Sequence, residues 1–433
     1  MTRMKESGID WIGQIPEEWE VSKLEHYVDI FGRIGFRGYT TNDIVNEGEG
    51  AISYSPSNII DYSVIDNNNT YISWSKYDES PEIQIKTGDV LYVKTGSSYG
   101  KTGIVNKLSN KATINPQLVV LKPKKNTDSR LINYFLNSSV GKEQSELIVG
   151  GSTIPTITQE SIKKMIFPKI SFEEQQKIAD FLDKKTAQLN KVKNLLEEQI
   201  QKLKDYRASL IYETVTKGLD KTVPMKDSGI DWIGQVPEGW GVKPLKYLAS
   251  YDDETLTQSE INSNRKIDYV DISSVEFTKG INGHQEFSTL EAPSRARKIA
   301  KKGDTIISTV RTYLKAIAYV NNDYIVSTGF CVVRPKKINS KYLNYTIMSD
   351  SFTGPVSKYA WGVSYPAISS SQLVNIPIPF PESIEEQLSI VDYLDHKMLQ
   401  LNKLIDIKQE QIENINKQRQ TLIYDYVTGK RRV

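Results

Sequence analysis

The strongest constraint in this sequence is an internal repeat. Residues 4–19 return almost unchanged as residues 225–240, and shorter matches follow in the same order until both copies end in Leu-Ile-Tyr, at Leu210 and Leu422. By contrast, residues 30–85 and 250–300 share almost nothing. A repeat of this kind indicates two copies of one structural unit placed in series. The preserved frame and its divergent inserts together suggest one scaffold that reads two different targets.

Each copy ends in a segment with the pattern of one long helix. The first segment, residues 171–213, opens with Ser171 and Glu174 at capping-box spacing and contains neither Pro nor Gly. A helix of roughly 40 residues is about 60 Å long, and the second segment opens in the same way at Ser383. Apolar residues recur every three or four positions, as in a coiled coil. The residues expected to pack the two helices together are Ile178, Leu182, Leu189, Val192, Leu196, Leu203 and Leu210 in the first, with Lys185 and Gln199 as polar members of its seam, and Ile390, Leu394, Leu401, Ile415 and Leu422 in the second.

The order of the segments predicts the direction of this helix pair. The first helix leads into the second globular region and the second helix leaves it, and the two ends of a compact domain usually lie close together. The helices must therefore run antiparallel if they pair, which returns the C-terminus to the N-terminal segment. We expect the first domain at 1–172, the first helix at 173–215, a linker with the second domain at 216–384 and the second helix at 385–433.

Each globular domain is expected to belong to the α+β class. Short runs of β-branched and aromatic residues, such as 89–94 and 305–310, are separated by Gly, Asn and Ser turns. Helical patterns are few within the domains. The predicted fold is therefore two α+β domains separated by two long antiparallel helices, which form an intramolecular coiled coil with a pseudo-twofold relation between the copies. The tryptophans of the repeat, Trp11, Trp19, Trp232 and Trp240, are expected to pack near the helix ends.

The composition excludes several classes of protein. The chain is 38% hydrophobic and 25% charged, which is typical of a globular protein. It has no run of ~18 apolar residues and its N-terminus is polar, so we expect a cytoplasmic protein that does not enter membranes. The single cysteine, Cys331, agrees with a reducing compartment. The three histidines lie far apart and make no usual zinc spacing, so no metal site is expected.

The sequence shows no catalytic constellation. Residues 96–102 resemble a phosphate-binding loop, but the glycine that such a loop needs falls on Thr95 and the following residues read as a strand instead of a helix. The histidines lie outside any recognisable nucleophile motif. We therefore expect a non-catalytic chain. The alternative from the enzyme class is a stand-alone nuclease or NTPase that uses residues 96–101.

Polar, basic and aromatic loops give a better functional signal than any catalytic motif. Arginine can read guanine through two hydrogen bonds, and Asn or Gln can read adenine, while Lys, Ser and backbone amides hold phosphates. We expect a DNA-binding role for clusters of such residues in both domains. The candidates are Arg33, Arg37, Tyr39, Lys94, Ser97, Ser98, Tyr99, Lys101, Asn115 and Gln117 in the first domain, and Arg265, Arg295, Arg297, Lys298, Thr309, Arg311, Thr312, Tyr313, Lys315, Trp361, Ser364 and Tyr365 in the second.

Over its whole length, the chain resembles the specificity subunit of type I restriction–modification systems. The resemblance rests on residues 12–19 and their copy, on a Gly-Asp turn before a strand, on a Pro-x-Ile element, and on the two helices that open with Glu173-Glu174-Gln175 and Glu385-Glu386-Gln387. It implies that each domain is a target-recognition domain for one half of a split site in double-stranded DNA. It also implies that the helices set the gap between the halves and dock two modification subunits.

The resemblance further implies that the cofactors lie on partner subunits. The modification subunits would bring S-adenosylmethionine, and motor-nuclease restriction subunits would use ATP and Mg, with no cofactor on this chain. The net charge of only +2 is small for a self-sufficient DNA binder, which suggests that partners supply much of the phosphate contact. A coiled-coil scaffold without a DNA role is the alternative from the structural class.

Overall fold

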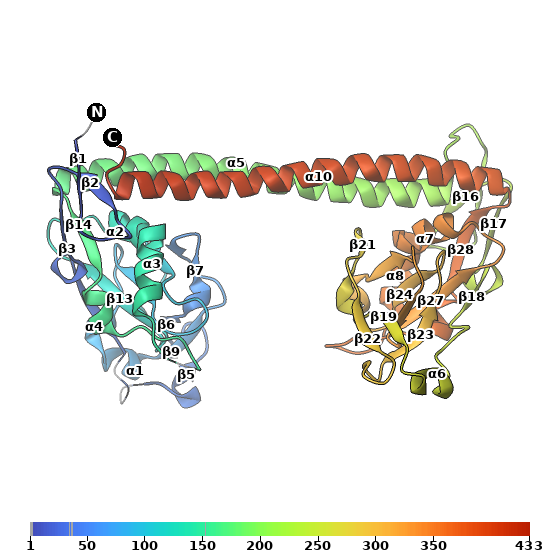
Figure 1. Cartoon of the computed structure of the whole chain (residues 1–433), viewed down its shortest axis with the longest axis horizontal. Coiled ribbons are helices and arrows are strands. Elements are labelled where there is room, and N and C mark those ends of the chain that lie inside the picture. The colour runs from blue at the N-terminus through green and yellow to red at the C-terminus, as the bar shows by residue number, and fades with distance from the viewer. Residues whose placement is uncertain (1–2, 34, 36–37, 152) are drawn as a thin grey trace. The chain divides into compact units, whose positions relative to one another are not determined.

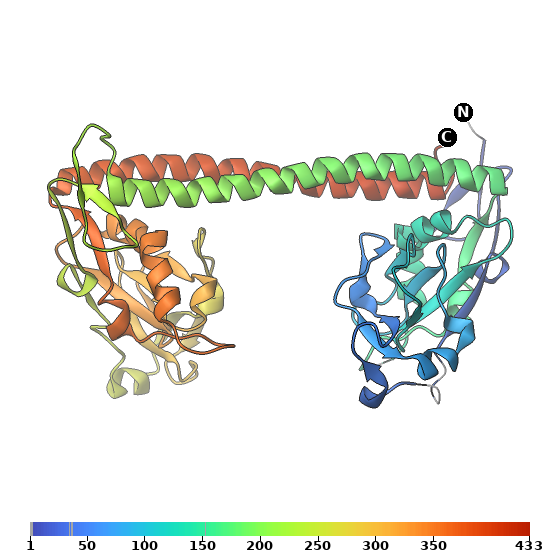
Figure 2. The same ribbon diagram turned by 180° about the vertical axis from the view of Figure 1, so that it is seen from behind.

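The computed structural model describes residues 3–33, 35, 38–151 and 153–433 and divides into two compact units. Unit 1 comprises Met1–Leu196 and Glu410–Val433, and unit 2 comprises Glu197–Gln409. Each unit therefore contains a globular part together with one end of each long helix. Figure 1 gives the element labels, and Figure 2 shows the same ribbon from behind.

Unit 1 is built on a six-stranded sheet in the order β4-β13-β10-β11-β8-β7 and a four-stranded sheet in the order β12-β6-β9-β5. Its strands alternate with turns and short helices, as the α+β prediction requires. The strands are β1 (Met4–Glu6), β2 (Gln14–Pro16), β3 (Glu20–Lys23), β4 (Val28–Gly32), β5 (Ile44–Val45), β6 (Gly50–Tyr54), β7 (Ile59–Ile60), β8 (Ser63–Val64), β9 (Thr70–Ser73), β10 (Val90–Val93), β11 (Thr102–Ile104), β12 (Ala112–Ile114), β13 (Leu118–Pro123) and β14 (Ile166–Lys169), and the short helices are α1 (Trp74–Asp78), α2 (Ser129–Asn137), α3 (Ser139–Ile148) and α4 (Gln159–Lys163).

Unit 2 repeats this plan with one difference at the edge of its first sheet. The order β18-β27-β24-β25 matches β4-β13-β10-β11, but the β20-β21 hairpin forms a separate sheet instead of extending it as β8 and β7 do. A second sheet has the order β22-β19-β26-β23. The strands are β15 (Met225–Asp227), β16 (Gln235–Pro237), β17 (Trp240–Pro244), β18 (Ala249–Tyr251), β19 (Lys266–Val270), β20 (Val275–Glu276), β21 (Gly280–Ile281), β22 (Gln285–Ser288), β23 (Ala296–Ala300), β24 (Thr305–Ser308), β25 (Ile317–Tyr319), β26 (Tyr324–Ser327), β27 (Phe330–Pro335) and β28 (Pro377–Pro381), and the short helices are α6 (Gln258–Asn262), α7 (Ser340–Met348), α8 (Asp350–Tyr359) and α9 (Ser370–Leu373).

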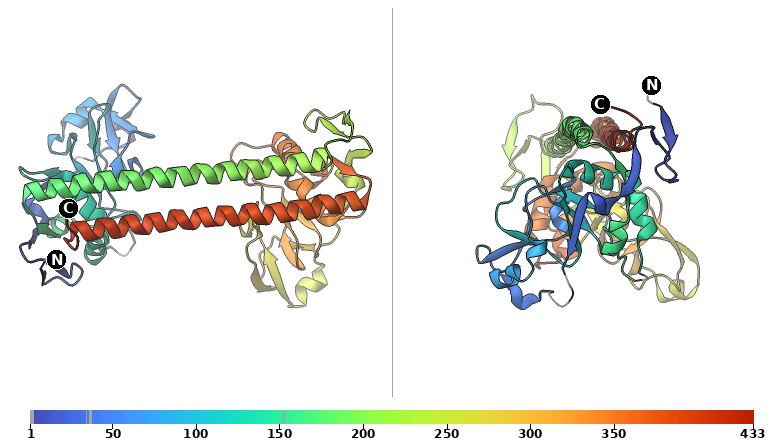
Figure 3. Two further views of the ribbon diagram at one scale, coloured as in Figure 1. Left: turned by 90° about the horizontal axis from the view of Figure 1, so that it is seen from above. Right: turned by 90° about the vertical axis from the view of Figure 1, so that its left-hand side faces the viewer.

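The two long helices are α5 (Phe172–Lys217) and α10 (Ile384–Val427), and they lie side by side in antiparallel orientation (Figure 3). In unit 1, the ring of Phe181 near the start of α5 lies 4.4 Å from the ring of Tyr426 near the end of α10. In unit 2, Arg207 Nη1 donates to Asn402 Oδ1 at 2.9 Å. The predicted antiparallel coiled coil within one chain is thus confirmed. None of the described helices is long and apolar enough to cross a membrane.

The predicted helix seam needs a correction at three positions of α5. Val192 is 48% exposed, and Lys185 and Gln199 are exposed too. The seam instead includes Thr186 and Ile200, which are buried. In each case, the true seam position is one residue later, about 100° further around the helix. The other predicted seam residues are buried or half-buried: Ile178, Leu182, Leu189, Leu196, Leu203, Leu210, Ile390, Leu394, Leu401, Ile415 and Leu422.

The ends of the long helices belong to the hydrophobic cores of the units. Ile178 and Leu182 of α5 pack with Ile423 of α10 in the core of unit 1. Ile211 of α5 and Ile390 of α10 do the same in unit 2. Removing apolar surface from water on both sides of this contact stabilises the helices more than their own propensity does. Each globular part is therefore packed directly onto its helix ends.

A glycine lies just after the end of each long helix. Gly429 has φ of 72°, and a Cβ there would lie 2.5 Å from Pro16. Gly218 at the end of α5 has φ of 68° and lies against Trp240. Left-handed backbone and close approach both favour glycine at the end of a helix. The C-terminal segment therefore lies against the N-terminal segment, as the order of the repeat predicts.

Candidate nucleic-acid interface

Three loops of unit 1 meet at the end of β10. Lys94 N donates to Gln117 O at 2.9 Å, and Lys94 O accepts from Ile157 N at 2.8 Å. Gly96 N donates to Pro155 O at 3.0 Å. These backbone bonds join residues 94–101, 115–117, 150–151 and 153–157 into one surface, which we call loop cluster 1. The structure thus brings together seven predicted residues from two separate segments of the sequence.

The side chains of loop cluster 1 are polar and accessible. Ser97, Lys101 and Gln117 are exposed, and Lys94, Ser98, Tyr99 and Asn115 are half-buried. Asn115 Nδ2 donates to Gln117 Oε1 at 3.1 Å, which orients the two amides together. Amide groups held in this way can form paired hydrogen bonds with an adenine edge.

The structure buries Arg33, which is one of the predicted DNA-binding residues. Arg33 is only 5% exposed, and its Nε donates to Ile114 O at 3.2 Å. Burial lowers the pKa of its guanidinium, which lies 5.3 Å from the ring of Tyr39. The Arg33 guanidinium is therefore held inside unit 1, beside the half-buried Tyr39. Arg37 lies outside the described residues.

Unit 2 builds an equivalent surface from the same backbone bonds. Thr309 N donates to Gly329 O at 2.8 Å, and Thr309 O accepts from Ile368 N at 2.8 Å. Trp361 and Ala367 exchange two backbone hydrogen bonds at 2.8 and 2.9 Å. We call residues 309–315, 328–329 and 361–368 loop cluster 2. Its frame matches that of loop cluster 1 although its side chains differ.

Large apolar and aromatic side chains stand exposed on loop cluster 2. Trp361 is 80% exposed, and Tyr365 is 63% exposed with the Arg311 guanidinium 4.7 Å from its ring. Tyr313 and Ser364 are exposed beside them. An exposed patch of this kind is typical of a surface that binds a macromolecule. Arg311 has φ of 51°, a conformation that non-glycine residues adopt mainly where the surroundings impose it.

Other candidates in unit 2 have structural partners. Lys298 Nζ donates to Asp252 Oδ2 and to Phe330 O, both at 2.6 Å, so its charge is paired within the domain. Lys315 pairs with Asp350 at 2.9 Å. Two further predicted residues, Thr309 and Thr312, are buried.

The remaining arginines of unit 2 differ in their placement. Arg295 is exposed, and its carbonyl accepts from Thr328 N at 2.9 Å, which places it beside loop cluster 2. Arg297 is half-buried, and Arg265 is exposed with an ion pair to Glu260 at 3.4 Å.

Sequence reasoning missed part of each surface. Residues 150–151 and 153–157 of unit 1, with Ile154 59% exposed, belong to loop cluster 1, and Val363 is fully exposed in loop cluster 2. A signal was present, because the Pro155 and Pro366 segments align in the repeat and the second segment contains the predicted residues Trp361, Ser364 and Tyr365.

The loop that resembles a nucleotide-binding motif lies between two strands. Residues 94–101 connect β10 to β11, so the helix that a P-loop requires is not there in the described structure. The strand predicted after this loop is confirmed. One group of potential metal ligands occurs among the described residues, formed by Asp268, His284 and Glu286, and all three are exposed. Exposed acidic groups of this kind are common without a metal.

Comparison with known proteins identifies the family of this chain. The family model of the type I restriction modification DNA specificity domain matches residues 16–202 and again residues 237–417. The MjaVIII specificity subunit of Methanocaldococcus jannaschii is 24% identical over 439 residues, covering 97% of this chain and 94% of the relative. The EcoDI specificity subunit of Escherichia coli is 24% identical over 279 residues, covering 61% of each chain.

A solved structure shares the whole fold. It comes from work on complex assembly and conformational transition of the type I R-M system, and it matches with a TM-score of 0.69 at 17% identity, covering 96% of this chain and 99% of that one. The two matches of the family model coincide with the two copies of the repeat. The chain therefore belongs to the family of type I restriction–modification specificity subunits, which are non-catalytic and recognise DNA sequence.

Proposed function

We propose that this chain reads a bipartite DNA site, with loop cluster 1 and loop cluster 2 each contacting one half. The observation that carries the proposal is the pair of matching loop frames. The backbone bonds of Lys94 and of Thr309 are the same, whereas the side chains on the two frames differ. Two readers with one frame and different side chains would recognise two different half-sites.

The side chains suggest how each half is read. In loop cluster 1, Asn115 and Gln117 suit an adenine edge, and Lys101 suits a phosphate. In loop cluster 2, Arg311 suits the two acceptors of guanine, and its stacking on Tyr365 restricts the guanidinium before DNA arrives. Trp361 can contact a thymine methyl group or a sugar. Contacts to bases would specify the sequence, and contacts to phosphates would position the protein.

We further propose that the helix pair sets the gap between the half-sites and docks two modification subunits. The packing of helix ends into each core supports a fixed connection between helix and reader. Large apolar side chains stay exposed along α10, among them Leu399 at 71% and Leu404 at 46%. A surface helix that exposes such residues is suited to cover by another protein.

In this proposal, all chemistry belongs to partners. The modification subunits would carry S-adenosylmethionine, and the restriction subunits would use ATP and Mg. The near-neutral charge of the chain supports sharing of the phosphate contacts with those subunits.

Methylation sequencing of DNA exposed to the reconstituted complex tests the proposal. We expect one split motif with two specified halves and an unspecified gap. In the variant R311A, methylation should fall by roughly 5- to 150-fold at a site whose guanine is read, because one paired contact is worth about 1–3 kcal/mol. R431A, an exposed arginine in unit 1, is the matched control. The absence of any motif would contradict the proposal and support a scaffold without a DNA role.

A further inference from the structure

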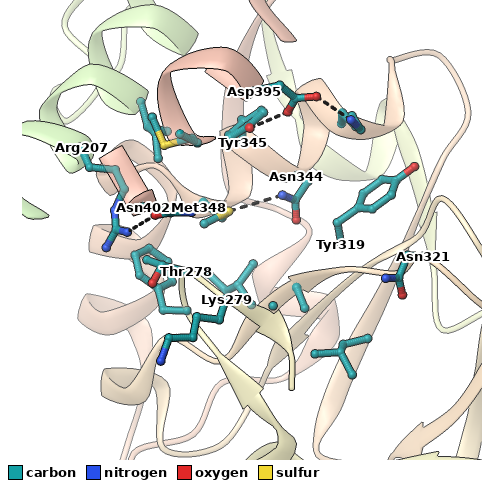
Figure 4. Close-up of a pocket in the computed structure, with 18 residues that line it drawn as sticks. Arg207, Thr278, Lys279, Tyr319, Asn321, Asn344, Tyr345, Met348, Asp395 and Asn402 are labelled. Atoms are coloured by element: carbon teal, nitrogen blue, oxygen red, sulfur yellow. Dashed lines mark hydrogen bonds and ion pairs between the residues drawn. The ribbon is translucent and has the colours of Figure 1, made fainter. Parts of the chain in front are cut away.

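Unit 2 contains a cavity of about 330 Å³ between its helix ends and its β20-β21 hairpin (Figure 4). Arg207, Asn344 and Asn402 line it on one side, from α5, α7 and α10. Lys279 and Thr278 of the hairpin turn line it on another. Phe277 also lines the cavity, and its ring centroid lies 5.4 Å from Nζ of Lys315 in loop cluster 2.

In unit 1, the corresponding place is occupied by a turn of the chain itself. The turn between β7 and β8 carries Asp61 and Tyr62, which have φ of 46° and 67°. Such backbone conformations cost of order 1–3 kcal/mol in a non-glycine residue unless the surroundings hold them. Here, residues of α2, α5 and α10 stabilise this backbone conformation.

Three side chains grip this turn. Arg419 of α10 forms an ion pair with Asp61, and its guanidinium lies 4.2 Å from the ring centroid of Tyr62. Asn190 of α5 donates through Nδ2 to Asp61 Oδ2 at 2.8 Å. Asn133 of α2 donates through Nδ2 to the carbonyl of Tyr62 at 2.8 Å. The turn thus supplies a carboxylate, a ring and a carbonyl to three fixed partners.

The repeat places the same three residue types around the cavity of unit 2. Arg207 and Arg419 each precede the shared Leu-Ile-Tyr sequence at the same distance. Asn190 and Asn402 each occur in the sequence Gln-Leu-Asn-Lys. The counterpart of Asn133 is Asn344, because each stands before the tyrosine that bonds to an aspartate of the long helix. All three gripping residues are therefore retained.

Unit 2 has no acidic and aromatic turn like Asp61 and Tyr62 to fill this place. Its hairpin turn consists of Phe277, Thr278 and Lys279, none of which offers a carboxylate. Arg207 is left to donate to the neutral amide of Asn402 at 2.9 Å, and burial lowers the pKa of its guanidinium.

Asn344 is also left without the partner that its counterpart has. Its Nδ2 lies 3.3 Å from the weak acceptor Met348 Sδ. Its Oδ1 is buried without a hydrogen-bond partner among the described residues. The Nδ2 donor of Asn344, which has only a weak acceptor, and the half-buried cation of Arg207 would both gain from a ligand that offers oxygen acceptors.

We infer that this cavity binds an acidic residue followed by an aromatic residue, presented by a partner protein. The carboxylate would accept hydrogen bonds from Arg207 and Asn402. The ring would lie on the guanidinium, and the backbone carbonyl between them would accept from Asn344 Nδ2. The charge of Arg207 and the donors around it favour an anionic segment over a neutral one. This inference does not depend on the proposed reading of DNA.

Titration of the full chain with a synthetic peptide tests the inference. The probe is acetyl-Ile-Ile-Asp-Tyr-Ser-Val-amide, the sequence of the occupying turn in unit 1, and the control peptide carries Asn and Leu in place of Asp and Tyr. Two of the methionines, Met348 and Met398, line the cavity, so the methyl resonances of 13C-labelled methionine report binding directly. We expect saturable shifts of these two methyls, with those of Met4 and Met225 unchanged.

Variants separate specific binding from damage to the fold. R207A should weaken binding about tenfold or more, since it removes the charged partner of the carboxylate. R207K should weaken it less, and R419A, the counterpart in unit 1, should leave it unchanged. The inference is overturned if no saturable shift occurs up to about 5 mM peptide. It is also overturned if the control peptide binds equally well, or if R207A binds like the unaltered chain while its other methionine signals stay native.

Discussion

The indole Nε1 of Trp240 donates a hydrogen bond of 2.9 Å to Oε1 of Glu386, and the same bond, at 3.3 Å, joins Trp19 to Glu174 in the other unit. Each tryptophan ends the repeated N-terminal segment, and each glutamate lies in the first turn of a long helix. The bond therefore explains why the Trp motif and the Glu-Glu-Gln motif occur together twice. It fixes the start of each helix to the domain that precedes it.

Loss of this bond should destabilise unit 2. The substitution W240F keeps an aromatic ring but removes the donor to Glu386, and such a bond is worth about 1.5–3 kcal/mol when the acceptor is charged. Urea unfolding should show a decrease of this size. W232F is the control, because Trp232 Nε1 is buried and has no hydrogen-bond partner in the described structure. Equal effects of the two substitutions would show that ring volume, not the hydrogen bond, matters.

A larger effect is expected at Gln387, which is 1% exposed. Its Oε1 accepts from Asn339 N at 2.7 Å, and its Nε2 donates to Pro381 O at 2.8 Å. Q387A would remove the partner of one buried and one half-buried backbone group and should cost about 2–5 kcal/mol in the free energy of unfolding. Q411A, on an exposed face of α10, should change it by less than about 0.5 kcal/mol. A neutral result for Q387A in denaturant titrations would contradict this account of the Glu-Glu-Gln motif.

Cys331 should be unreactive in the folded chain. Burial of the thiol raises its pKa to about 12, so the reactive thiolate is scarce near neutral pH. Because the folded pKa lies above the unfolded value of about 8.5, the thiol contributes its full stability below pH ~8.5 and loses it as the pH rises toward 12. A thiol reagent at pH 8 should label the chain only after denaturant is added. Rapid labelling of the native chain would contradict this prediction.

The length of the helix pair should set the gap in the DNA site. Insertion of one heptad into both long helices adds about 10.5 Å, which corresponds to roughly three base pairs at 3.4 Å each. Motif mapping by methylation sequencing should show both half-sites unchanged and the gap about three base pairs longer. An unchanged gap in a complex that still methylates would refute this role of the helices.

The architecture could be predicted from the sequence because its signals are repeated. The duplicated segments show two units, and the cap at Ser171 with the apolar periodicity shows a long helix. Connectivity then determines the antiparallel direction. The exact residues of the helix seam could not be predicted in the same way. Val192 and Lys193 are neighbours on α5, and the apolar pattern favours Val192, but the packing of the helices places Lys193 at the seam.

The candidate DNA surface was predicted in outline but not in detail. Residue type alone cannot show that Arg33 is buried, that Lys298 donates to the carbonyl of Phe330, or that Arg311 is exposed. The three-part loop clusters depend on bonds such as Lys94 to Gln117, which join segments far apart in sequence. The contacts that hold the turn at Asp61 and Tyr62 could not be predicted for the same reason, because they come from residues on α2, α5 and α10.

The most direct test of the account is to map the methylated motif after one reader is exchanged. Residues 30–165 would be replaced by the corresponding region of another specificity subunit, and the reconstituted complexes would be compared by methylation sequencing. Our account predicts that one half of the motif changes while the other half and the gap stay the same. A change in both halves, or in neither, would contradict the claim that each unit reads one half of the site.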